Sequence, residues 1–228
     1  MPQTPTHAQL LATADEPRAL GDLRTYFGTD RPAGTMPRYT GGFFELLAGG
    51  GDRAEVAHRI TADDLLAVQM LSVRAPGEVA LDLLEGPLGE EVAAHLARID
   101  TSVAIGTPEA ARLLADDGPA AQAWALLKKP DGMGWVIANK LLARKRPALI
   151  PVYDGVIRCA FRPPNRKLWN WLNPLFAEQD GALPALLTER RDAAGVPHEV
   201  SPLRVLDVIV WMRHRAEHRA SRCPGLTW

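Results

Sequence analysis

The chain has 228 residues and a formal net charge of −1 at pH 7, and 46% of its residues are hydrophobic against 23% charged. These values are ordinary for a soluble globular protein and allow one large domain or two small ones around a sizeable core. The two cysteines exclude a four-thiolate cluster and a disulfide-rich scaffold. We find no apolar run of membrane-spanning length and no secretory leader, so we expect a cytoplasmic protein with no membrane partner.

The charges are unevenly distributed. Residues 1–120 hold 9 Lys/Arg and 18 Asp/Glu, a net charge of −9, whereas residues 121–228 hold 17 and 9, a net charge of +8. A basic half points to a polyanionic partner. The alternative is that the two halves attract each other within one fold, and the sequence leaves both explanations open.

Helical patterns follow one another along the chain. They begin at 16–27 and 42–48, and a Thr cap with an acid three residues later predicts another helix start at Thr61. Cap-then-proline pairs predict starts at Thr107 and Ser201, the latter opening a helix over 202–213. Further helices are expected at 78–84, 89–99, 119–128, 135–145, 155–162, 167–177 and 182–193. Because no hairpin turn is flanked by strand-like alternation, we predict an all-α fold.

Residues 120–146 are expected to form a helix, a tight turn and a second helix. Gly132 and Gly134 lie in the turn, where glycine permits positive φ and close backbone approach. The free N–H groups that begin the second helix, with the positive end of its dipole behind them, make an anion site that phosphate commonly fills. Nearby positive charge could come from three lysines, Lys128, Lys129 and Lys140. The alternative is an ordinary αα-hairpin that only joins two core helices.

This hairpin resembles the helix-hairpin-helix motif, which binds the DNA backbone in repair proteins. The sequence "RPALIPVYDGVIRCAF" follows it, and Asp154 lies 20 residues after Gly134. That separation is similar to the one in the helix-hairpin-helix DNA glycosylase superfamily, typified by endonuclease III. The segment "DDLLAVQMLSVRAP" at 63–76 also resembles an early core helix of these enzymes and the loop after it.

The resemblance covers residues 63–162 and implies an all-α, two-lobed glycosylase-like fold. One lobe, 62–150, would contain the hairpin. The second lobe would be formed by both chain ends, 1–61 and 151–228, with the aspartate at the junction facing a cleft.

The resemblance also implies roles for individual residues. Asp154 occupies the position of the aspartate that stabilises an oxocarbenium-like transition state or activates water as the base–sugar bond breaks. Helix capping is its alternative role. Arg74 matches a residue that enters the gap left by the flipped base, or else it is a surface arginine that closes a helix. Trp135 could line a base pocket or pack the hairpin.

Three features of the chain depart from the superfamily pattern. Bifunctional members carry a nucleophilic lysine where this chain has Val136, so lyase activity by that route is not expected. The four-cysteine iron–sulfur loop of endonuclease III is missing, so no cofactor is expected. Gly155 also stands where relatives often have a bulkier polar residue.

Two further basic segments have open explanations. Arg144, Lys145 and Arg146 either contact phosphate or suit the C-terminus of a helix. "HRAEH" at 214–218 matches a His-x-x-Glu-His zinc pattern, but only ten residues follow to supply a carboxylate ligand. We interpret it as a basic helix end and predict no metal site.

The sequence therefore predicts a monofunctional DNA N-glycosylase that acts on double-stranded DNA and is associated with the nucleoid. The alternative is a non-catalytic helix-hairpin-helix module that binds DNA. Neither the base recognised nor any protein partner can be identified from the sequence.

Overall fold

The computed structural model describes residues 4–32, 34–36, 38–164, 167–218, 223 and 226. Throughout these ranges the chain forms helices, turns and irregular segments and no strand, so the all-α prediction is confirmed. None of the helices in the described part is both long enough and apolar enough to cross a membrane.

The helices begin with α1 (His7–Asp15) and α2 (Pro17–Phe27), followed by two short 3-10 helices, η1 (Thr40–Phe43) and η2 (Leu47–Gly49). The middle of the chain forms α3 (Ala62–Met70), α4 (Gly77–Glu85), α5 (Pro87–Leu96), α6 (Pro108–Leu113), α7 (Pro119–Lys128) and α8 (Trp135–Lys145). The last helices are α9 (Gly155–Phe161), α10 (Leu168–Ala193) and α11 (Pro202–His218).

Three elements differ from the sequence prediction or refine it. Helix α1 was not predicted, although Thr6 and Gln9 form a capping box at its start. The helix expected at 42–48 is wrong, because this glycine-flanked segment forms 3-10 turns and irregular backbone with Ala48 at φ 51°. Helix α10 is broken at 178–181, where three residues have positive φ, so its two parts correspond to the two helices predicted there.

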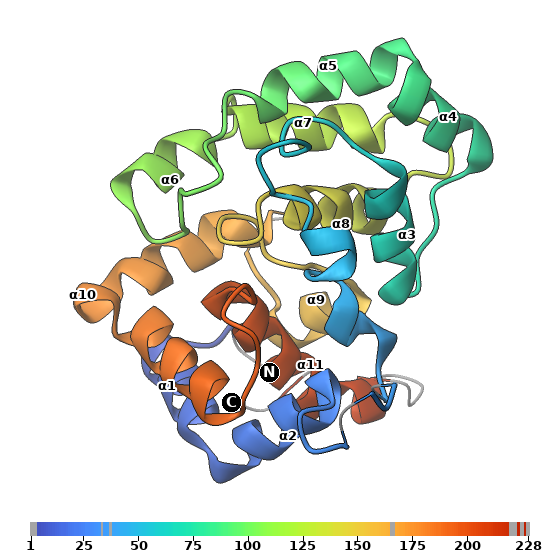
Figure 1. The fold of residues 1–228 in the computed structure, drawn as a ribbon. Helices are drawn as coiled ribbons and strands as arrows, with labels where there is room; N and C mark the ends of the chain where they lie inside the picture. Colours follow the sequence, from blue (N-terminus) through green and yellow to red (C-terminus); the bar gives the residue numbers. More distant parts are fainter. Residues whose placement is uncertain are drawn as a thin grey trace.

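The helices pack in two sets. Helix α5 packs on α4 and α7, and α8 packs on α3 and α7; in the other set α10 packs on α1 and α11, and α11 packs on α2 and α9. Figure 1 shows α4, α5 and α7 at one end of the molecule and α1 and α2 at the other, with α8 and α9 between them. One continuous hydrophobic cluster includes residues of both sets. Helices α8 and α9 therefore lie where the two sets meet.

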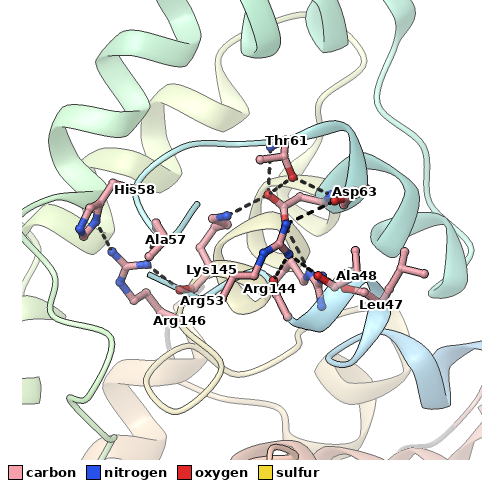
Figure 2. Close-up of polar contacts among 12 residues, drawn as sticks. Leu47, Ala48, Arg53, Ala57, His58, Thr61, Asp63, Arg144, Lys145 and Arg146 are labelled. Atoms are coloured by element: carbon pink, nitrogen blue, oxygen red, sulfur yellow. Dashed lines mark hydrogen bonds and ion pairs between the residues drawn. The ribbon is translucent and has the colours of Figure 1, made fainter. Parts of the chain in front are cut away.

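The basic C-terminus of α8 is buried rather than exposed. Arg144 Nε lies 3.2 Å from Asp64 Oδ1, and Lys145 Nζ lies 2.9 Å from Asp64 Oδ2. Arg146 donates to main-chain carbonyls that include those of Ile99 and Ala57. Figure 2 shows these basic side chains directed from α8 towards the preceding segments of the chain. The phosphate-contact explanation for these three residues is wrong, because their charged groups bind the protein itself.

Ion pairs of this kind join the acidic first half of the chain to its basic second half. Basic residues of 121–228 pair with acidic residues of 1–120 in Arg144–Asp64, Lys145–Asp64, Arg204–Glu45, Arg213–Glu16, Lys167–Asp116 and Arg190–Asp15. The pairs made by Asp64 and Glu45 are almost fully buried. Mutual attraction of the two halves is therefore present, and any nucleic-acid surface depends on the other basic residues.

Candidate functional site

The turn between α7 and α8 is exposed at both glycines. Gly132 has φ +78°, and a Cβ atom on it would lie 2.7 Å from Pro76 Cγ, so glycine is required there on two grounds. Met133, between the glycines, is fully buried and anchors the turn. A Cβ atom on Gly134 would meet nothing within 4 Å. The space in front of Gly134 is therefore open to a ligand.

The first amides of α8 follow this open glycine directly. Among the described residues no side chain caps the helix, whose N-cap is Gly134. The Gly134 carbonyl accepts hydrogen bonds from Ile137 and Ala138, at 3.1 and 3.3 Å. The N–H groups of Trp135 and Val136 precede these bonds and have no partner within the helix. They have the arrangement expected of an anion site.

A basic and aromatic groove adjoins the hairpin. It has a volume of about 660 Å³ and is lined by Trp124, Lys128, Trp135, Tyr153, Arg158, Arg162, Pro163 and Pro164. The rings of Trp135 and Tyr153 are 4.9 Å apart, and the Arg158 guanidinium lies 5.8 Å from the Trp135 ring. Lys128 Nζ lies 4.3 Å from the Trp124 ring. Two of the predicted DNA-binding residues, Lys128 and Trp135, are thus brought together.

The structure places two other predicted residues differently. Lys129 lines a separate groove together with the acidic Asp82, Glu91 and Asp131. Arg74 is exposed and precedes by two residues the proline that contacts the hairpin turn. Arg74 is therefore close in sequence to the hairpin contact, whereas Lys129 is on another face of the turn from Lys128.

Asp154 caps α9 and also opens to a pocket. Its Oδ1 accepts hydrogen bonds from the N–H groups of Val156 and Ile157, at 3.0 and 3.1 Å. Its Oδ2 lies 3.8 Å from Lys140 Nζ, and the side chain is 20% exposed. The pocket that it lines has a volume of about 260 Å³. The capping role is present, and it leaves part of the carboxylate accessible.

Lys140 lies in this pocket and not on the hairpin surface. Its side chain is 4% exposed, and Nζ donates to the Leu71 carbonyl at 2.9 Å as well as facing Asp154. Burial lowers the pKa of Lys140, while the Asp154 charge acts in the opposite direction. The prediction that Lys140 adds charge to the phosphate site therefore differs from the structure, because the ammonium group is directed at an internal carbonyl and a carboxylate.

The pocket has an aromatic and basic wall. Tyr39 stacks on Tyr26 with ring centres 5.3 Å apart and meets Trp211 edge-on at 5.8 Å. The Arg215 guanidinium lies 4.7 Å from the Tyr39 ring. Residues 38–41 line the pocket, although the sequence around them indicated no site. Ser72, also on the wall, has φ 62°, a strained conformation for a non-glycine residue.

A second carboxylate, Asp207, also lines the pocket and was missed by the sequence analysis. It is ion-paired with Arg204, while its Oδ1 has no hydrogen-bond partner among the described residues. Burial raises the pKa of Asp207 to about 7; Arg204 opposes this shift, and the Asp154 charge adds to it. One feature of the sequence could have indicated Asp207: it follows Leu203 by one helical turn, which places an acid on the apolar face of α11. Both residues are buried in the structure.

Comparison with known proteins identifies a family. Residues 19–214 match the family described as "Family of unknown function (DUF6308)". The chain belongs to this family. No curated protein and no solved structure matches the chain. The DUF6308 match includes the hairpin, Asp154, Lys140 and Asp207, and it ends at His214, one residue before Arg215 of the pocket wall.

Proposed function

We propose that this protein binds double-stranded DNA through the hairpin and excises a damaged or modified base in the Asp154 pocket, as a monofunctional DNA N-glycosylase of the helix-hairpin-helix type. The observation that carries the proposal is the placement of residues 71–76. Leu71 and Ser72 line the Asp154 pocket, and Pro76 contacts Gly132 in the hairpin turn. One short loop thus connects the expected phosphate site with the expected chemical site.

The origin of the pocket residues supports a two-lobed, glycosylase-like arrangement. Residues 70–72 and Lys140 come from the proposed 62–150 lobe. The other wall comes from both ends of the chain, namely residues 26, 38–41, 152, 154 and positions 204–215 of α11. A pocket between the lobes is where the superfamily resemblance puts the aspartate, and a flipped nucleotide would enter it from the hairpin side.

The proposed chemistry is hydrolysis of the N-glycosidic bond. The base leaves with the bonding electrons, positive charge develops on the sugar, and water adds at the sugar carbon. The added water loses a proton, and the departing base gains one. A fixed carboxylate stabilises that developing charge, and Asp154 is held in place by two backbone N–H groups and by Lys140. Tyr39 and Trp211, whose rings meet edge-on, offer aromatic faces against which an extruded base could stack.

The proposed backbone contacts lie around the start of α8. The N–H groups of Trp135 and Val136 would donate hydrogen bonds to a phosphate group, and exposed Lys128 would add a cation beside it. Arg158, above the Trp135 ring, extends this basic and aromatic surface. Because these contacts neutralise phosphates, binding should weaken as salt is raised, and Lys128→Gln should lower the slope of log affinity against log salt by about 1.

The test is base release from a panel of lesion-bearing duplexes by wild type, Asp154→Asn and Asp192→Asn. Asparagine caps a helix as well as aspartate does, so Asp154→Asn removes the charge while keeping α9 capped. We expect release by wild type and by the exposed control Asp192→Asn, and loss of release with retained DNA binding in Asp154→Asn. Wild-type inactivity on the whole panel, or full activity of Asp154→Asn, would reject the catalytic role.

The same assay examines the absence of lyase activity. Val136 replaces the usual lysine, but Lys140 lies in the Asp154 pocket. We expect no covalent enzyme–DNA adduct on borohydride reduction. An adduct that Lys140→Gln abolishes would show that the enzyme is bifunctional.

A non-catalytic DNA-binding module is the second candidate function. It is favoured by the fact that both Asp154 carboxylate oxygens already have protein partners, the α9 amides and Lys140. This function predicts salt-sensitive duplex binding that Asp154→Asn leaves unchanged, with no base release. If the chain binds no duplex even at low salt, the hairpin only joins two core helices, and both proposals fail.

A further inference from the structure

Four side chains from separate parts of the chain converge at the C-terminal end of α11. Cys159 lies on α9, His214 and His218 lie one turn apart on α11, and Cys223 follows that helix in the sequence. One ligand atom from each residue lies within 4.8 Å of every other. The two Sγ atoms are 3.5 Å apart, and Cys223 Sγ is 3.4 Å from His214 Nε2.

The Sγ–Sγ separation and the Sγ–Nε2 separation fit the edges of a tetrahedron around one metal ion, and the remaining ligand atoms lie within 4.8 Å of them. Zinc–sulfur bonds of about 2.3 Å and zinc–nitrogen bonds of about 2.0–2.1 Å put tetrahedral ligand atoms about 3.3–3.8 Å from one another. A disulfide would require the two sulfur atoms to be about 2.05 Å apart. At 3.5 Å, Cys159 and Cys223 are separate thiols at the spacing of two ligands of one ion.

The histidines are oriented as ligands. His214 is fully buried, its Nε2 faces the Cys223 sulfur, and its Nδ1 lies 3.8 Å from Glu217 Oε2. The Nδ1 atoms of His214 and His218 are buried, and neither has a hydrogen-bond partner among the described residues. Buried imidazoles without partners are costly unless another interaction compensates them. A metal bound at His214 Nε2 would leave the ring proton on Nδ1, where it faces Glu217 as an outer-sphere carboxylate. A metal bound at His218 Nδ1 would give that buried nitrogen a partner.

We propose that Cys159, His214, His218 and Cys223 form a closed, structural Zn²⁺ site. On binding, each thiol loses one proton, so two thiolates and two neutral imidazoles surround the ion and the site is electrically neutral. Four protein ligands leave no open position for water or substrate, which makes the role structural. Zinc was not expected from the sequence, because only ten residues follow the His-x-x-Glu-His segment to supply a carboxylate ligand. The structure provides two cysteines in its place.

The site would join the two helices that shape the Asp154 pocket. Helix α9 carries Cys159, and its N-cap is Asp154; helix α11 carries both histidines after the pocket residues. His218 Nε2 also lies 3.8 Å from where a Cβ atom on Gly155 would be, so its ring is beside the first residue of α9. The inference depends only on these ligands and not on DNA binding, so it can hold or fail independently of the proposed function.

The experiment measures metal content and coordination of the full chain, purified under reducing conditions without chelator. We expect about one zinc per chain by elemental analysis. After zinc removal, addition of Co²⁺ should give the visible bands of tetrahedral cobalt and a thiolate-to-cobalt charge-transfer band. Zinc addition to the metal-free chain in weak buffer should release about two protons and raise the melting temperature.

Ligand variants identify the site. Cys159→Ser, Cys223→Ser and His214→Gln should each weaken zinc binding by more than the roughly 10- to 100-fold typical of losing an outer-sphere partner. Exposed His198, whose Nδ1 lies 3.4 Å from Glu199 Oε2, provides the matched control His198→Gln, which should bind zinc as wild type does. Cys223→Ser is the informative variant if substitutions inside α9 or α11 prevent folding, because Cys223 lies outside both helices.

Three results would overturn the inference. The first is a reduced, folded wild-type chain that takes up neither zinc nor cobalt. The second is metal uptake that Cys159→Ser and Cys223→Ser leave unchanged. The third is a disulfide between these cysteines in protein purified with zinc present, detected by mass and thiol counting.

Discussion

Replacing Asp64 with asparagine tests whether the buried basic end of α8 depends on a single carboxylate. Asp64 is 1% exposed and faces Arg144 at 3.2 Å and Lys145 at 2.9 Å, both fully buried. Its Oδ2 also accepts the Thr61 N–H at 2.9 Å, which completes the capping box of α3. Asparagine keeps the volume but removes the negative charge, so two buried cations lose the carboxylate that compensates them.

The expected cost follows from the burial of this cluster. Removing one partner of a buried ion pair destabilises a protein by about 3–5 kcal/mol, because the remaining charge is left without compensation. For a chain of 150–250 residues, 1 kcal/mol corresponds to roughly 2–4 °C in melting temperature. Asp64→Asn should therefore lower the melting temperature by roughly 6–20 °C. It should also lower the urea concentration at the unfolding midpoint and leave zinc binding unchanged.

The adjacent residue provides the matched control. Asp63 is 46% exposed and lies 3.5 Å from partly exposed Arg53, so Asp63→Asn makes the same chemical change in a solvated pair. Exposed pairs contribute about 0–1 kcal/mol. Thermal and urea unfolding of the two variants, followed by circular dichroism, gives the comparison. If the unfolding free energies of Asp64→Asn and Asp63→Asn differ by less than about 1 kcal/mol, the buried cluster does not hold the segment before α3 against α8.

Three further predictions concern the turn and the pocket. Gly132→Ala should lower the free energy of unfolding by about 1–3 kcal/mol in urea titrations, because of its positive φ and the contact with Pro76. At Gly134 an added methyl group meets nothing within 4 Å, so the unfolding free energy of Gly134→Ala should stay within about 0.5 kcal/mol of the wild-type value. The same variant should weaken duplex binding measured by fluorescence anisotropy. Unchanged binding would argue against the hairpin as the DNA site. The raised pKa of Asp207 means that its stabilising contribution is complete below its ordinary pKa and is lost as pH rises through about 7. Asp207→Asn should therefore flatten the decline of unfolding free energy over this range, and an unchanged pH profile would contradict the assignment.

Local signals in the sequence were sufficient for the hairpin. The helices predicted at 119–128 and 135–145 have these bounds in the structure, because proline begins the first, the glycine turn separates them, and a second proline follows. The glycines are exposed as a ligand-binding turn requires. Each of these features depends on residues close together in the sequence, which periodicity and turn chemistry can detect.

Tertiary pairing could not be predicted in the same way. Arg144, Lys145 and Arg146 were expected either to contact phosphate or to suit the C-terminus of a helix, and neither explanation includes burial, which is rare for such residues. Asp64, the buried carboxylate that forms ion pairs with Arg144 and Lys145, is far from both in the sequence. The pocket poses the same problem, since Asp207 and residues 38–41 meet Asp154 only after the chain ends fold onto the middle segment.

The candidate zinc ligands illustrate both kinds of information. His214 and His218 are visible in the sequence because four residues separate ligands on one helical face. Their partners are not, since Cys159 lies on a different helix and no fixed spacing relates it to either histidine. Of the proposed partners, Cys223 does lie in the ten residues after His218, but it is a thiol and not the carboxylate that the His-x-x-Glu-His pattern requires.

Helix α9 connects the two proposals physically. With seven residues it is too short to be stable alone, so its position depends on what holds its ends. Asp154 caps the first turn, and Cys159 would attach the second turn to α11 through zinc. If the metal fixes α9, zinc removal should displace the Asp154 carboxylate relative to Lys140, whereas Asp154→Asn should leave zinc binding intact. Zinc removal therefore tests what holds α9 in position, whereas Asp154→Asn tests the proposed chemistry of the carboxylate.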